Sequence, residues 1–201
     1  MKSKFLWWAV GVTAALALGA GVCGLAQDST PAHFSGAIND YTPISGGLTA
    51  WEVRGPWSLT LNTESGTADF SAAVTMEFSV LGQSPANVQA AALNQHTHHI
   101  TMTGAAVTYN PSDCPVPSSI TPIPRIELKG MATVAANGGP FPPSSSTPVP
   151  SPLQVCIDGG TAVGTVVTYS NITLAFGTPA SGHFGSQAIH GVVRKANWRD
   201  D

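Results

Sequence analysis

Basic residues are scarce in this 201-residue chain, which carries eight Lys and Arg against eleven Asp and Glu. Lys2 and Lys4 belong to an N-terminal segment that we expect to be removed, so six basic residues remain and the net charge becomes −5. Nucleic-acid binding relies on a stripe or patch of Lys and Arg, and the six that remain form none. We therefore expect no nucleic-acid partner.

Familiar catalytic motifs are also missing. The sequence has no Gly-x-Ser-x-Gly elbow, no His-Glu-x-x-His and no Gly-rich phosphate loop, which lowers the odds of the common hydrolases. The carboxylates of Glu52, Glu77 and Glu127 each stand between two apolar residues, so strand alternation should send all three outward. A glycosidase-like mechanism needs two carboxylates in one cleft. No catalytic residue is assigned, and whether the protein is an enzyme stays open.

Cysteine is rare as well, with three in the chain. Cys23 lies in the segment that we expect to be removed, which leaves Cys114 and Cys156 as a pair. Two cysteines in an exported protein usually form a disulfide. At a separation of 42 residues, the cross-link would stabilise the fold by roughly 4 kcal/mol. The Cys-x-x-Cys spacing of reactive pairs is absent, which favours a structural role.

The N-terminus has the layout of an export signal. Basic residues come first, then an uncharged apolar run, then small residues at the positions read by signal peptidase. We predict a signal peptide over 1–26, with cleavage before Gln27, and a rival uncleaved anchor is long enough to span a bilayer. The remaining 27–201 suffice for one domain and are short for two. We expect this domain to be periplasmic or secreted, with no membrane attachment after cleavage.

Period-two alternation of apolar residues dominates the mature chain, and it is clearest over 68–80, where each even position is apolar. A strand over 51–61 precedes it, with a hairpin turn at 64–66 between them. Further strands are expected near 33–38, 97–108, 125–136, 153–158, 162–176 and 187–194. One short helix is expected near 84–94, where Ser84 can cap and Pro85 can begin it. Eight or nine strands predict an antiparallel β-sandwich or a flattened β-barrel, all-β in either case.

Three of the six histidines fall within the run His96-Thr97-His98-His99. On a strand, His96 and His98 share a face with Ile100 and Met102, and two imidazoles at this spacing can hold one cation. The alternatives are that the cluster is a half-buried polar rim at the strand end, or that a histidine acts as a general base or ligand contact in a pocket rim.

A third metal ligand must come from elsewhere in the chain. His183 is the first candidate, because its Gly-rich surroundings let the backbone approach a site closely. His190 and His33 are the substitutes. The ion would be a transition metal such as zinc or copper.

Two families resemble parts of this pattern. The segments His96-Thr97-His98, Gly182-His183-Phe184 and His190-Gly191 resemble fragments of the copper/zinc superoxide dismutases, which are exported β-sandwiches with one disulfide. By that resemblance His96, His98 and His183 would be metal ligands. That family has more histidines, an aspartate after its His-Phe segment and much shorter spacing. The His-x-His also resembles the first cupin motif, without the glutamate that should follow, so the chain is assigned to neither family.

The sequence thus favours an exported β-domain with a binding or structural role, in which a His-x-His strand site holds a metal ion or a small ligand. A metal-dependent redox or hydrolytic enzyme using the same histidines is one alternative. A barrel-type carrier of an apolar ligand is another, because small residues at inward positions could leave room inside. These positions are Ala68, Ala72, Gly130 and Ala132. The small ligand or protein partner is unknown.

Overall fold

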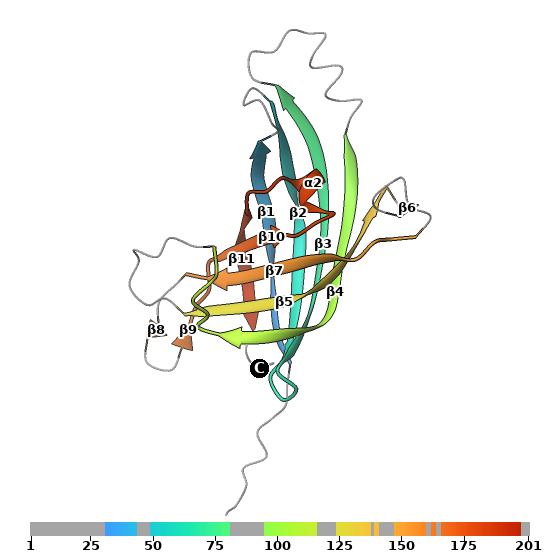
Figure 1. Ribbon diagram of the computed structural model, residues 1–201. Helices are drawn as coiled ribbons and strands as arrows, with labels where there is room; N and C mark the ends of the chain where they lie inside the picture. The colour runs from blue at the N-terminus through green and yellow to red at the C-terminus, as the bar shows by residue number, and fades with distance from the viewer. Residues whose placement is uncertain are drawn as a thin grey trace, which may run out of the picture.

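The structure is a computed structural model of the chain (Figure 1). It describes residues 31–43, 49–80, 95–115, 124–137, 139–140, 147–159, 162–163 and 166–197. The signal peptide expected over 1–26 and the helix expected near 84–94 lie outside the described residues. No helix in the described part is long and apolar enough to cross a membrane.

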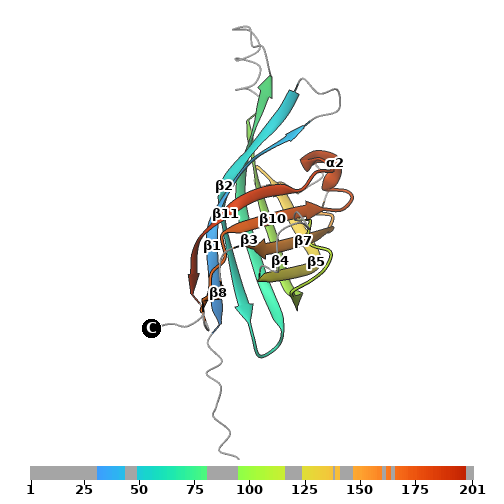
Figure 2. The ribbon, with the colours of Figure 1, turned by 90° about the vertical axis from the view of Figure 1, so that its left-hand side faces the viewer.

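Eight antiparallel strands form a closed barrel. They are β1 (Ala32–Pro43), β2 (Thr49–Asn62), β3 (Thr67–Val80), β4 (His96–Tyr109), β5 (Arg125–Ala136), β7 (Ser151–Asp158), β10 (Asn171–Phe176) and β11 (Ile189–Asn197). Their order is β4-β3-β2-β1-β11-β10-β7-β5, and pairing of β4 with β5 closes the ring. Figures 1 and 2 show β1 to β3 as long, curved strands, with β5, β7 and β10 running across them at a steep angle. The all-β prediction is confirmed, with a barrel as the architecture.

The alternation seen in the sequence makes the core. On β3, the side chains of Ala68, Phe70, Ala72, Val74 and Met76 are all buried, and the intervening residues face outward. The expected hairpin is present, since residues 63–66 turn between β2 and β3 and the two strands pair from Asn62↔Thr67 onward. Alternate side chains along each strand therefore point inward, and together they fill the barrel.

The prediction of a single long strand over 162–176 is wrong. The chain instead forms β8 (Ala162–Val163) and β9 (Val166–Val167), which pair with each other in a separate two-stranded sheet, before β10 begins at Asn171. The backbone N–H of Ser170 donates to Asp158 O and its carbonyl accepts from Val193 N–H, so the chain re-enters the barrel only there. A further short strand, β6 (Gly139–Pro140), extends β5 by pairing with its end.

Glycine allows β4 to bend between its two neighbours. The β4–β5 register shifts between Thr101 and Ala106, and Gly104 within that stretch has a φ of +61°. Residues with a side chain rarely adopt this conformation, so the bulge depends on glycine. The carboxylate of Asp69 on β3 accepts the Gly104 N–H at 2.8 Å. Bulges of this kind supply the curvature that closes a barrel.

Small residues on the inward face allow neighbouring side chains to pack closely, and Gly130 shows this directly. At Gly130 on β5, a Cβ atom would lie 2.9 Å from the Met102 sulfur, so Met102 already occupies the space that a side chain would need. Ala68, Ala72 and Ala132 are each at most 3% exposed. Small residues therefore bring neighbouring strands together there, as expected in a filled barrel.

The disulfide prediction is confirmed, because Cys114 and Cys156 are joined with their Cα atoms 5.9 Å apart. Cys156 lies on β7, and Cys114 lies on the segment that follows β4. The bond ties that segment to the outer surface of the barrel. A disulfide is typical of proteins outside a reducing compartment.

Candidate metal centre

A short helix places His183 against the barrel. The helix α2 (Ser181–Phe184) follows β10, and it is anchored by Phe184, which is fully buried and stacks on Phe176 with ring centroids 4.6 Å apart. The Ala180 N–H donates a buried hydrogen bond of 3.2 Å to Ser151 Oγ. The side chain of His183 reaches His96 and His98 at the beginning of β4. His183, one residue before the anchor, is therefore held close to the start of that strand.

Strand β4 supplies the other two histidines. Its inward face carries His96 and His98 together with Ile100 and Met102, whereas His99 faces outward and is exposed. His98 is only 1% exposed, and His96 is half-buried nearer the strand end. The predicted face of the strand is therefore the one observed, and alternation alone separates two inward imidazoles from the outward one.

The three rings meet through the same atom, Nε2. His183 Nε2 lies 3.0 Å from His96 Nε2 and 2.9 Å from His98 Nε2. One potential ligand atom from each residue lies within 4.8 Å of the other two. An imidazole Nε2 has either one proton or one lone pair, so the His183 nitrogen can form one well-aligned hydrogen bond at a time. Mutual hydrogen bonding therefore cannot satisfy both contacts, while a cation at their centre would accept all three lone pairs.

Burial and neighbouring rings keep His98 and His183 unprotonated at neutral pH. Burial, with the nearby rings of His183 and His96, lowers the pKa of His98 from 6.5 to about 3. The nearby backbone of Ala135 acts in the opposite direction and raises the pKa of His98. Burial and then His96 lower the pKa of His183 to about 4. A metal ligand must be neutral imidazole, so protons do not compete for these two nitrogens near pH 7.

Aromatic rings surround the cluster. Trp51 on β2 packs edge-on against His96 with ring centroids 5.1 Å apart, and Phe184 packs against His98 at 4.9 Å. Trp57 is buried in the core, whereas Trp51 on the same strand is half-buried and contacts His96 and His183. Only the barrel's closure brings Trp51 to His183.

The two substitute ligands lie elsewhere. His33 on β1 is exposed, and its Nδ1 lies 3.2 Å from the Thr60 hydroxyl. His190 on β11 is exposed beside Asp40, with 2.8 Å between its Nδ1 and the carboxylate Oδ2. Neither belongs to the group formed by His96, His98 and His183. Of the predicted ligand candidates, the first three are brought together and the last two are not.

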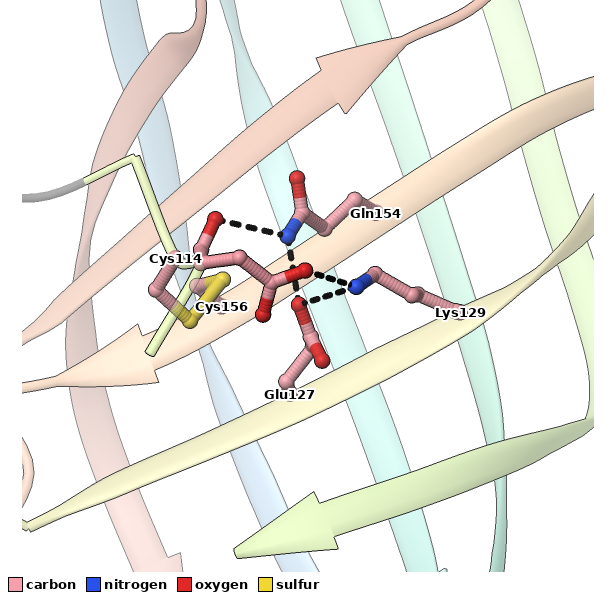
Figure 3. Close-up of polar contacts among 6 residues, drawn as sticks. Cys114, Glu127, Lys129, Gln154 and Cys156 are labelled. Carbon is pink, nitrogen blue, oxygen red and sulfur yellow. Dashed lines mark hydrogen bonds and ion pairs between the residues drawn. A yellow bond between two sulfur atoms is a disulfide. The ribbon is translucent and has the colours of Figure 1, made fainter. Parts of the chain in front are cut away.

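A second buried group lies under the disulfide. Glu127 faces outward, as alternation predicts, yet it is only 3% exposed. It lies on the outer face of β5, directly opposite Cys156, and the Cys114 segment covers it (Figure 3). Glu127 has an ion pair of 3.0 Å with Lys129 and accepts a hydrogen bond from Gln154 Nε2. Alternation predicted its face correctly, but it could not predict the loop folded over that face.

The other two strand carboxylates behave as expected. Glu52 and Glu77 lie on the outer face and both pair with Arg54, Glu77 at 2.7 Å. The sulfur atoms of Cys114 and Cys156 lie near the Glu127 carboxylate. Because they are bonded to each other, neither is a thiolate that could bind a metal ion. The histidine cluster is therefore the candidate metal centre in the described part of the chain.

Comparison with known proteins adds no relative, since no family model, curated protein or solved structure matches the chain.

Proposed function

We propose that this protein is an exported barrel that binds a transition-metal ion through the Nε2 atoms of His96, His98 and His183. The observation that carries the proposal is the convergence of these three atoms, with contacts of 2.9 and 3.0 Å around His183. The disulfide supports an exported location, because such bonds persist outside reducing compartments.

The donor set fits a metal of this class. Imidazole suits zinc and copper, and three histidines form a recognised zinc donor set with a fourth position left for another ligand. With metal–nitrogen distances of about 2.0–2.1 Å, nitrogen atoms in a tetrahedral site lie about 3.3 Å apart. The observed contacts would need to lengthen by a few tenths of an ångström. His183 sits on a four-residue helix, which can accommodate such a movement more readily than β4 can.

A metal-dependent redox or hydrolytic enzyme at the same histidines is the second candidate. The three-histidine donor set favours this enzyme candidate, because three protein ligands leave one coordination position for water or substrate. The half-buried His96 and His183 mark the side of the cluster nearest solvent. Activity assays on the metal-loaded protein separate this candidate from simple binding.

The test is metal content of the mature protein, residues 27–201, measured by elemental analysis after export and after add-back of zinc or copper to metal-stripped protein. We expect about one equivalent in the parent and none in the His96→Ala/His98→Ala variant. Trp51 fluorescence should respond to copper in the parent, because its ring contacts His96.

His99→Ala is the matched control, because His99 lies on the same strand between His98 and Ile100 but faces outward. It should retain the full equivalent of metal. Equal uptake by the parent and the double variant, or none by either, would refute the proposal. A thermal melt of each variant in the absence of metal shows whether the barrel is intact.

A further inference from the structure

We infer that the ion which this site prefers is monovalent copper, with the thioether of Met76 as a fourth, soft ligand. The inference rests on the proposed function and names its metal. Three features of the described residues support it, namely a donor set without charge, an apolar aromatic enclosure, and a buried methionine opposite His96.

The first feature is the absence of a counter-charge. No carboxylate or cysteine joins the three histidines in the described part of the chain. The internal segments outside that part, such as 44–48 and 81–94, contain no Asp, Glu, Cys or His. Near this end of the barrel, Glu52 and Glu77 lie on the outer face and are paired with Arg54. Among the described residues, a cation at the cluster therefore meets no compensating negative charge.

The second feature is the low polarity of the enclosure. Phe184 packs on His98, Trp51 packs on His96, and Phe176 stacks behind Phe184. The Born cost of placing an ion in an apolar environment grows with the square of its charge, so a divalent ion costs about four times as much as a monovalent ion. An uncharged donor set in such surroundings favours a single positive charge.

The third feature is Met76. It lies directly opposite His96 in the β3–β4 ladder, and it is fully buried on the inward face that His96 shares. Directly opposed residues have Cβ atoms about 4.5–5.5 Å apart. The flexible methionine side chain can bring its sulfur to an ion held by the imidazoles. Thioether donors select monovalent copper over zinc.

The experiment compares two metals on the same protein without oxygen. Copper(I) affinity is measured by competition with a coloured copper(I) chelator, and zinc(II) affinity by competition with a zinc indicator. We expect copper(I) to bind tighter than zinc by at least a hundredfold. Met76→Leu should weaken copper(I) at least tenfold and leave zinc within twofold. X-ray absorption of the copper-loaded parent should show one sulfur neighbour that Met76→Leu lacks.

Met102→Leu and Met131→Leu are the controls. Met102 is buried on the same barrel interior but packs against Gly130, and Met131 is exposed on β5. Neither should change copper affinity. Tighter zinc than copper(I), or copper bound without sulfur, overturns this inference while leaving a metal site at the histidines. If His96→Ala/His98→Ala loses both metals but Met76→Leu keeps its copper affinity, the role of Met76 is refuted and the histidine metal site remains. Binding of neither metal by the parent refutes the proposed function itself.

Discussion

Two buried polar groups in this barrel differ in how their charges are balanced. The histidine cluster lies on the inward face of β4, where three imidazoles converge and no carboxylate joins them among the described residues. Glu127 lies on the outward face of β5 beneath a disulfide-tethered segment, and Lys129 and Gln154 satisfy its carboxylate. Figure 3 shows these partners converging on Glu127.

The difference separates a structural group from a candidate binding site. A buried charge with an opposite charge and hydrogen bonds around it is internally balanced, so it needs no ligand. Three imidazole nitrogen atoms that crowd together gain little from one another and much from a cation. We therefore interpret the Glu127 group as part of the fold and the histidine cluster as the site that an ion completes. Changes of pH and substitutions in each region can test this contrast.

Acid should destabilise the metal-free barrel through the histidine cluster, and this should be the largest effect. In the unfolded chain these histidines have ordinary pKa values near 6.5, whereas in the fold the pKa is about 3 for His98 and about 4 for His183. Between pH 6.5 and 4 the unfolded chain binds more protons, so the free energy of unfolding falls as the pH falls. The loss should reach several kcal/mol, measured by urea unfolding at a series of pH values.

His98→Phe should flatten that pH dependence, because the ring volume stays while one buried titrating group is removed. His99→Ala should not, since His99 is exposed on the opposite face. Identical pH profiles for the parent and His98→Phe would show that the cluster does not govern acid stability.

Loss of the disulfide should cost the next largest amount. Replacing Cys114 and Cys156 with Ser removes a cross-link over 42 residues, which in the chain-entropy model is worth roughly 4 kcal/mol. Urea unfolding at pH 7 measures the difference. Metal uptake by the histidines should persist in the folded variant, because the disulfide lies on the outer face. If metal binding disappears while the barrel stays folded, the two regions are coupled and the contrast between them fails.

Removal of the Glu127 charge should have a smaller effect. Glu127→Gln leaves Lys129 without one carboxylate partner and should lower the free energy of unfolding by about 1–3 kcal/mol. Glu77→Gln is the matched control, because that carboxylate also pairs with a basic residue but its side chain is 37% exposed. Exposed ion pairs contribute about 0–1 kcal/mol. Equal losses in the two variants would mean that burial of Glu127 does not add to its role.

Most of the fold could be predicted because its signals are local. Alternation identified the long strands and the inward face of β4, and the turn residues identified the β2–β3 hairpin. The error at 162–176 arose because an apolar β-branched run shows no boundary where the chain leaves the barrel and returns. Alternation also could not distinguish a barrel from a sandwich, since both bury one face of each strand.

Local sequence was enough to establish which histidines can share a strand face, because side chains alternate with a period of two whatever the tertiary fold. It also established that the cluster lacks nearby acidic residues along the chain. The three-dimensional fold alone established that His183, 85 residues beyond His98, completes the group, because Phe184 anchors its helix against the barrel core. It likewise established that Glu127 is covered while Glu52 and Glu77 are not. Long-range contacts depend on closure of the barrel and on loop packing, and neither leaves a periodic trace in the sequence.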